Sequence, residues 1–115
     1  MMRGGIDRRQ FPRAEYPCNV VVLRSDLRKT FFTHTENIGT SGICVILSKE
    51  LPKFCPVEIL LYLKDGGTPI ESNGRIIWVV KREFNFDTGI EFIEIKEADR
   101  LRIEKLVQEC IRKQN

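Results

Sequence analysis

Arginine side chains near the start of the chain are the residues best suited to specific binding chemistry. Arg3, Arg8, Arg9 and Arg13 lie within the first 13 residues, where Asp7 is the only acid. The net charge of +3 therefore belongs to this short segment, because basic and acidic side chains balance over the rest of the chain. A guanidinium group carries a planar set of N–H donors that bind phosphate or carboxylate oxygens in pairs. The pattern predicts binding of a small anionic ligand or of one acidic patch, and it does not favour a protein that coats DNA with a basic face.

A second polar segment, Asn37-Ile38-Gly39-Thr40-Ser41-Gly42, separates two stretches of strand-forming residues. We expect a tight loop here, in which the asparagine hydrogen-bonds its own backbone, as this residue often does in turns. Gly42 is expected to permit a positive φ or a close backbone approach. Either role is a structural need that requires no ligand.

Catalysis, metal binding and membrane insertion have no support in the sequence. The four cysteines form no Cys-x-x-Cys pair, and we expect Cys44 and Cys110 to be buried as small apolar residues. The single histidine, His34, is expected to be packed or on the surface rather than catalytic. No apolar run reaches the roughly 18 residues of a membrane-spanning helix, and no secretory signal is expected. These observations predict a cytoplasmic protein that is not an enzyme and holds no metal and no cofactor.

Six strands and one helix are predicted from the spacing of apolar residues. We expect the strands at 19–24, 29–36, 42–47, 57–63, 70–80 and 87–93. Gly74 is expected to form a bulge or bend, and Trp78 and Phe92 are expected in the core. Over 96–113 the apolar residues recur on one helical face, at Ile103, Leu106, Val107, Cys110 and Ile111.

Short strands with tight turns and one amphipathic helix predict a mainly β fold, a small antiparallel barrel with a C-terminal α-helix packed on it. The length fits one domain. Within it we expect a flexible N-terminal arm over 1–16, the barrel over 17–95 and the helix over 96–113.

Three motifs resemble those of the PilZ family. Arg9-Gln10-Phe11-Pro12-Arg13 matches its Arg-x-x-x-Arg arm, with Arg8 as the commonly seen extra arginine. The segment 37–42 resembles the [Asp/Asn]-x-Ser-x-x-Gly loop, with Gly39 in place of the serine. Segments 74–78 and 89–92 are similar to late-strand patterns of the family. The resemblance runs from about residue 7 to the C-terminal helix and implies a six-stranded antiparallel PilZ-like β-barrel.

The resemblance also implies that the ligand is cyclic di-GMP, and hence a role in bacterial second-messenger signalling. Guanine presents O6 and N7 as adjacent acceptors, which match two parallel N–H donors of one guanidinium. Arg9 and Arg13 are thus expected to contact base edges and phosphates. Arg8 is expected to be either a third contact or a solvated charge. Asn37 is expected to contact a guanine, a role that can coexist with its role in the turn.

The remaining loop residues complete the expected ligand-binding set, with Gly39 and Gly42 as members and Thr40 and Ser41 as additional contacts. Gly39 lacks the hydroxyl that the family pattern carries, and Thr40 or Ser41 could replace it. One hydrogen bond contributes about 0.5–1.5 kcal/mol net. The missing hydroxyl is therefore expected to weaken binding by roughly tenfold.

Two functions follow from the resemblance. In the first, the protein is a receptor in which cyclic di-GMP orders the arm on the barrel and changes the contacts with a protein partner. In the second, it is a PilZ-like adaptor that binds a protein and no nucleotide, which Gly39 favours. A barrel that binds single-stranded nucleic acid ranks last, because the barrel region carries no net charge. No DNA or RNA partner and no membrane insertion are expected.

Overall fold

The computed structural model describes residues 12–113 of the 115-residue chain. Its elements in chain order are β1 (Arg13–Ala14), β2 (Asn19–Arg24), the 3-10 helix η1 (Ser25–Leu27), β3 (Lys29–Gly39), β4 (Gly42–Leu47), β5 (Pro56–Leu61), β6 (Ile70–Lys81), β7 (Phe86–Ile93) and α1 (Glu97–Lys113). Most of the predicted arm over 1–16, including Arg8 and Arg9, lies outside the described residues. The described end of that segment contains β1, a strand that the sequence analysis did not predict.

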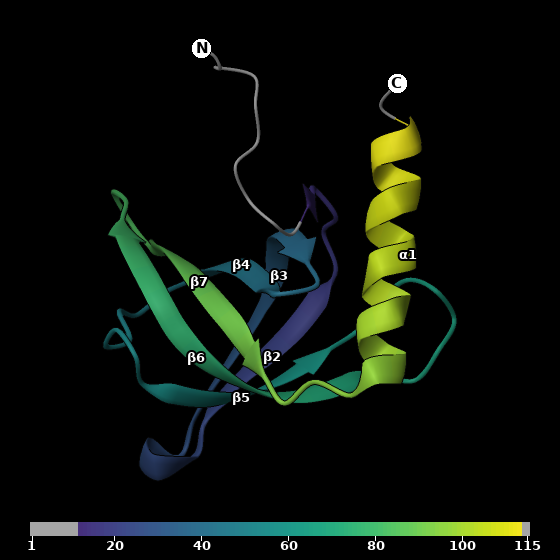
Figure 1. Ribbon diagram of the computed structural model, residues 1–115. Helices are drawn as coiled ribbons and strands as arrows, with labels where there is room; N and C mark the ends of the chain where they lie inside the picture. The colour runs from purple at the N-terminus through teal and green to yellow at the C-terminus, as the bar shows by residue number, and fades with distance from the viewer. Residues whose placement is uncertain (1–11, 114–115) are drawn as a thin grey trace.

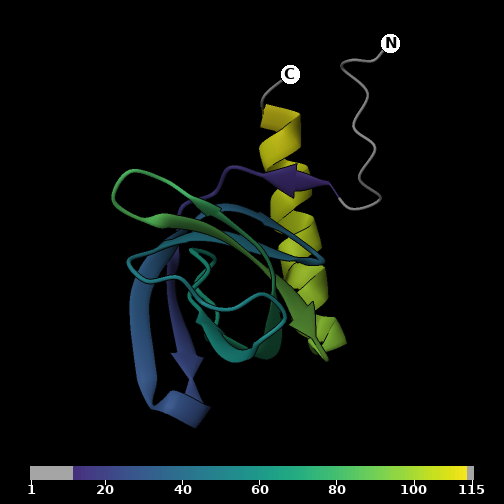
Figure 2. The same ribbon diagram turned by 90° about the vertical axis from the view of Figure 1, so that its left-hand side faces the viewer.

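The described strands form a closed antiparallel barrel. Six strands follow one another in the order β3-β2-β5-β6-β7-β4, and β4 also pairs with β3, which closes the ring. The two residues of β1 pair with the end of β3 as an outer strand. Closure leaves no long unpaired edge in the ring, and Figures 1 and 2 show the strands wrapping around one interior. The predicted six-stranded antiparallel barrel is thereby confirmed.

One apolar core fills the barrel and extends under the helix. Inward-facing side chains such as Val22, Ile38 and Ile76 are fully buried. Ile103, Leu106 and Val107 of α1 are buried in the same cluster, so the helix packs its apolar stripe on the barrel as predicted. In Figures 1 and 2, α1 stands beside the barrel with β1 next to it, and it contacts both β1 and β3.

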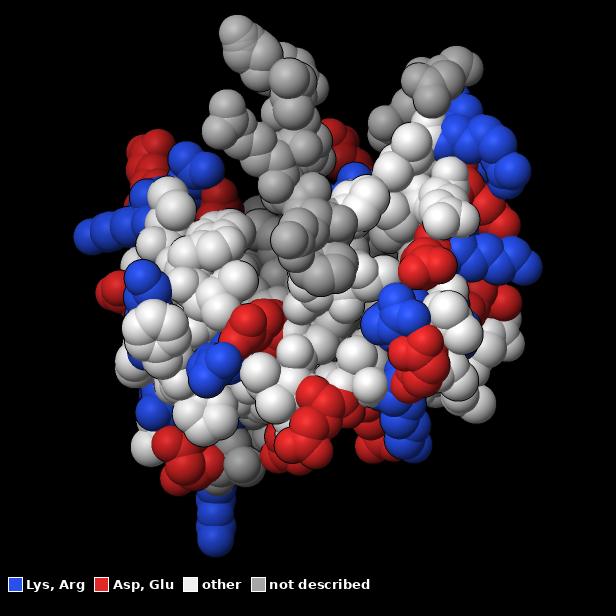
Figure 3. Space-filling model, in the orientation of Figure 1, with Lys and Arg blue, Asp and Glu red and all other residues white. Residues whose placement is uncertain are grey.

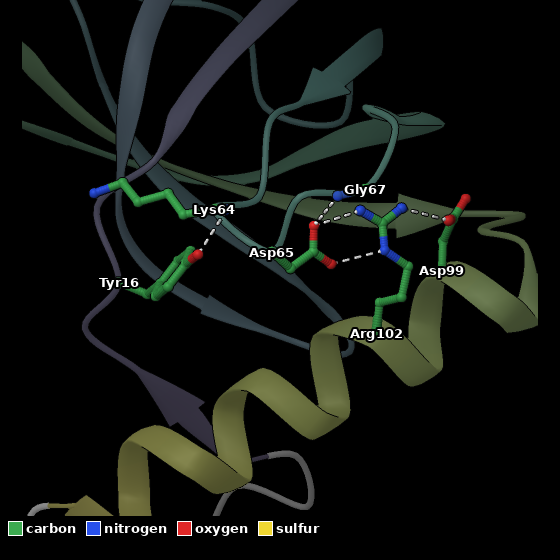
Figure 4. Close-up of polar contacts among 6 residues, drawn as sticks. All are labelled: Tyr16, Lys64, Asp65, Gly67, Asp99 and Arg102. Carbon is green, nitrogen blue, oxygen red and sulfur yellow. Dashed lines mark hydrogen bonds and ion pairs between the residues drawn. The ribbon is translucent and has the colours of Figure 1, made fainter.

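An ion pair fixes α1 to the loop between β5 and β6 (Figure 4). Arg102 donates from Nε and Nη2 to the two carboxylate oxygens of Asp65, each at 2.9 Å, and from Nη1 to Asp99 at 3.2 Å. Asp65 also accepts the backbone N–H of Gly67 at 2.9 Å. The guanidinium therefore holds the pKa of the Asp65 carboxyl below its ordinary value, against the opposing effect of desolvation.

The chain between β1 and β2 is held by hydrogen bonds as well. The Tyr16 hydroxyl accepts the backbone N–H of Lys64 at 2.7 Å, as Figure 4 shows. The Tyr16 carbonyl accepts the hydroxyl of Thr35 at 2.5 Å, and that hydroxyl also accepts the backbone N–H of Cys18 at 3.0 Å. Because these contacts anchor the segment that follows β1, they also restrict where Arg13 can lie.

Two bulges interrupt the regular pairing of the barrel. One lies in β3 between Thr35 and Asn37, opposite β4, and the other lies in β6 between Ile76 and Trp78, opposite β7. Of the bulge or bend expected at Gly74, the bulge is wrong, since this residue pairs in register with both neighbouring strands. A side chain at Gly74 would instead press on two isoleucines of the interior, Ile59 and Ile90.

Candidate ligand-binding site

Arg13 lies against the end of β3 and the start of β4. It pairs with Gly39 across β1 and β3. Its Nε donates to the side-chain oxygen of Asn37 at 2.7 Å, and its Nη2 donates to the carbonyl of Gly42 at 3.4 Å. Four residues of the predicted ligand-binding set, from two separate motifs, are thus brought together.

The bulge in β3 determines where Asn37 points. Thr35 faces inward opposite Val45, and both are fully buried. With Glu36 as the extra residue, Asn37 pairs with Cys44, while Ile38 returns to the interior. Regular alternation would have turned position 37 inward. The bulge therefore turns the Asn37 side chain to the outer face, a common use of bulges near binding sites.

Trp78 and Asn37 lie in one row of residues that pair across neighbouring strands, on the outer face of the barrel. Cys44 pairs with Asn37 on one side and with Gly89 on the other, and Gly89 pairs with Trp78. A side chain at Gly89 would overlap the indole ring of Trp78. The glycine therefore leaves the space that this ring occupies. Trp78 is 38% exposed, and the prediction that it lies in the core is wrong. The bulge at Ile77 turned it outward.

Phe92, by contrast, is partly buried and packs against the core. Its backbone N–H donates to the carbonyl of Ser41 at 2.9 Å, which ties the turn between β3 and β4 to β7.

Gly42 and Gly39 are positions of close approach rather than of positive φ. Among described glycines only Gly66 has a positive φ. A Cβ at Gly42 would collide with the carbonyl oxygen of Ile90 and lie 2.9 Å from the Glu91 Cα, so this glycine lets β4 meet β7. A Cβ at Gly39 would lie 2.9 Å from the carbonyl oxygen of Pro12. The missing side chain at position 39 thus makes room for the chain that leads into β1.

The other predicted site residues have different outcomes. The segment expected as a loop over 37–42 is shorter than predicted, because β3 continues through Gly39 and only Thr40 and Ser41 form the turn. Both turn residues are half-buried, and among the described residues neither side chain makes a hydrogen bond. His34 is exposed and lies 3.5 Å from the Glu36 carboxylate, on the surface.

Cys44 lies beneath this site. It is 5% exposed, and burial raises the pKa of its thiol, with Asp87 adding to the rise and Arg13 opposing it. The raised pKa keeps that thiol protonated at neutral pH.

Within residues 12–113, no group of three histidine, cysteine, aspartate or glutamate side chains could hold a metal ion. The one α-helix of the same range lacks the apolar character that crossing a bilayer requires.

A family model described as the PilZ domain matches residues 7–109. No curated protein matches the chain in sequence. Several solved structures share the fold. The inhibitor of motility MotI of Bacillus subtilis has a TM-score of 0.77 at 22% identity, over 95% of this chain and 52% of MotI. The K. pneumonia MrkH–c-di-GMP complex has a TM-score of 0.78 at 18% identity, over 94% of this chain and 54% of MrkH.

A third structure covers the PilZ domain alone. The PilZ domain of YcgR from Escherichia coli, solved with c-di-GMP, has a TM-score of 0.74 at 13% identity, over 93% of this chain and 94% of that one. The chain thus spans about half the length of MotI and MrkH but nearly all of the isolated domain. With a family model that covers almost every residue and a barrel of matching architecture, the chain belongs to the PilZ domain family.

Proposed function

We propose that this protein is a receptor for cyclic di-GMP, bound at Arg13, Asn37 and the turn up to Gly42, with Arg9 as the second arginine. The observation that carries the proposal is the hydrogen bond from Arg13 Nε to Asn37 at 2.7 Å. It joins the arm motif to the loop motif. A side chain already held in one place loses less conformational entropy when a ligand binds.

The chemistry of this pair suits a guanine or a phosphate. A guanidinium only donates hydrogen bonds, so the amide oxygen of Asn37 must face Arg13. The amide nitrogen of Asn37 then points away from Arg13, and among described residues it has no acceptor. It can donate to guanine O6 or N7, or to a phosphate oxygen. Trp78, three strands away in the same row, offers a partly exposed ring on which a base can stack.

The described residues suggest how binding changes the surface. β1 follows Pro12 directly and contacts α1, so a ligand that moves the arm also acts on the helix. We propose that the output is a change in contacts with a protein partner, without catalysis. DNA and RNA are not proposed as partners, because charges balance outside the first 13 residues.

A nucleotide-independent adaptor is the second candidate, and Gly39 is the observation that favours it. Its missing side chain leaves room for β1 to dock on β3, which is the arrangement an adaptor needs permanently.

An NMR titration of the ¹⁵N-labelled protein with cyclic di-GMP tests the proposal. We expect saturable shift changes at Arg13, Asn37 and the turn up to Gly42, together with the indole N–H of Trp78, the only tryptophan. GMP serves as the control, because it supplies one guanine without the second base. No shift at millimolar cyclic di-GMP would instead support the adaptor.

A further inference from the structure

The outer face of β2, β5 and β6 carries apolar side chains where a half-exposed sheet usually carries polar ones. One row of paired residues crosses the strands as Phe32, Val21, Leu60 and Glu71. Phe32 is 82% exposed, and Val21 and Leu60 are half-buried although they point away from the core. Leu23 continues the strip along β2. This apolar strip lies outside the site of Arg13 and Asn37.

A groove of about 450 Å³ runs along the apolar strip, between Val21 and Leu60 on one side and the segment after β7 on the other. Its rim is acidic, formed by Glu58, Glu71 and Glu94, with Lys96 as the one basic residue in the lining. Figure 3 shows acidic side chains gathered at the lower centre of the molecule, where Figure 1 places β5 and β6.

Most other carboxylates of the described residues form ion pairs, whereas the three rim glutamates do not. Glu91 pairs with Arg75, and Asp87 pairs with Arg82, across neighbouring positions of the sheet. Glu58, Glu71 and Glu94 form no ion pair within residues 12–113 and are exposed. The groove thus combines an apolar floor with negative charge that no described side chain neutralises, which is the complement of a basic amphipathic segment.

The geometry limits how a partner can bind. Four adjacent strands at about 4.8 Å spacing make a strip about 14 Å long, which roughly ten residues of α-helix can cover. β2, β5 and β6 are each paired on both sides, so a partner cannot add a strand to them. Recognition must come from side chains that lie in the groove.

We propose that this face binds an amphipathic segment of another protein, with apolar side chains on Val21 and Leu60 and lysine or arginine beside the rim glutamates. A second copy of the chain is a poor occupant, because the basic and acidic side chains of its residues 14–115 balance. The proposal does not depend on nucleotide binding, since the groove contains none of the residues of that site.

Two synthetic 18-residue peptides of helical amphipathic spacing, one of leucine and lysine and one of leucine and glutamate, provide the probe. We expect the lysine peptide to shift NMR signals of Val21, Leu23, Leu60 and Glu71, and the glutamate peptide to shift none. Binding should weaken as salt rises, because exposed charges are screened.

Matched variants separate this face from non-specific attraction. Glu58→Gln with Glu71→Gln should weaken lysine-peptide binding at least fivefold, while Glu50→Gln with Glu83→Gln, two exposed acids elsewhere, should leave it unchanged. Phe32→Ser should weaken it, and Phe54→Ser, an exposed phenylalanine outside both that row and the lining of the groove, should not.

Three results would each overturn the proposal. The two glutamate double variants weaken binding equally, the lysine peptide shifts NMR signals on another face, or the protein self-associates through Val21 and Leu60 as its concentration rises. Cyclic di-GMP affinity is measured on the same variants and is expected to be unchanged. A failure of nucleotide binding can therefore be told apart from a failure of the docking face.

Discussion

Arg13 and Gly39 lie opposite each other where β1 meets β3, and the pair leaves no room for a side chain on the glycine. A Cβ at position 39 would lie 2.9 Å from the Pro12 carbonyl oxygen and 3.2 Å from Cγ of Arg13. The first distance is shorter than packed atoms tolerate, and a backbone carbonyl cannot rotate away as a flexible side chain does. The glycine that replaces the family serine is thus coupled to the docking of the arm.

Gly39→Ala is expected to loosen β1 while leaving the barrel folded. Overpacking of this kind typically costs about 1–3 kcal/mol, and here the two-residue strand can move away to relieve it. Hydrogen exchange of the Arg13 and Ala14 amides should speed up by roughly tenfold or more, whereas exchange in β5 and β6 should not change. Thr40→Ala, which adds no atoms in the adjacent turn, is the control. Unchanged exchange in Gly39→Ala would mean that β1 does not depend on the glycine.

Gly39→Ser and Gly39→Ala both add a Cβ at position 39, and the serine variant also adds a hydroxyl. A difference in their ligand affinities therefore measures the effect of the hydroxyl alone. We expect the serine variant to bind cyclic di-GMP up to about tenfold more tightly than the alanine variant, because one hydrogen bond contributes about 0.5–1.5 kcal/mol. Calorimetric titration of both variants measures the difference. Equal affinities would show that Thr40 or Ser41 already supplies the hydroxyl, or that none is used.

Asn37 is expected to contribute to binding in two ways, by positioning Arg13 and by contacting the ligand directly. Asn37→Ala removes the acceptor of Arg13 Nε and should weaken cyclic di-GMP binding by roughly tenfold or more, since hydrogen bonds to charged groups contribute about 1.5–3 kcal/mol. Asn37→Asp keeps an acceptor for Arg13 but loses the amide N–H that can donate to the ligand, so its affinity should lie between those of the wild type and Asn37→Ala. If both variants bind equally weakly, the amide nitrogen matters more than the position of Arg13.

Much of the fold could be predicted from the sequence, because the strands that face the core alternate regularly and the helix keeps one apolar stripe. Val20 and Val22, or Ile103 and Val107, show these periods directly. The bulges break the same rule. Counting in twos from Ile76 places Trp78 inside, and only the extra residue in β6 explains why it lies outside.

The candidate site was harder to predict, since its residues are positioned by contacts distant in sequence. Arg13 and Asn37 were both expected to bind the ligand, but their mutual hydrogen bond depends on β1, which is too short to show a pattern. The space constraint at Gly39 comes from Pro12, a residue 27 positions earlier. The roles of Arg8 and Arg9 remain predictions.

The Asp65–Arg102 pair is expected to stabilise the docking of α1 in a pH-dependent way. Both side chains are less than one-third exposed, so Asp65→Asn should lower the free energy of unfolding by about 1 kcal/mol at pH 7. The folded-state pKa of Asp65 is lowered, so this contribution is present above the ordinary value of about 4 and is lost as pH falls through the lowered pKa.

Urea denaturation of both proteins from pH 7 to pH 2 measures the effect. The difference between wild type and Asp65→Asn should disappear at the acidic end. Glu97→Gln, which breaks the far more exposed pair with Arg100, should change stability much less at every pH. A constant difference across the range would show that Asp65 acts by packing and not by charge.

Calorimetric titration with cyclic di-GMP of the wild type and three arginine variants tests the central claim most directly. We expect saturable binding by the wild type, loss of detectable binding in Arg9→Ala and Arg13→Ala, and normal binding in Arg24→Ala. Arg24 and Arg28 form a second Arg-x-x-x-Arg match, and Arg24 pairs with Asp26 instead of contacting the site. Folding of each variant is checked by its thermal transition. Wild-type affinity in both Arg9→Ala and Arg13→Ala, or no heat from the wild type at high ligand concentration, would contradict the receptor assignment.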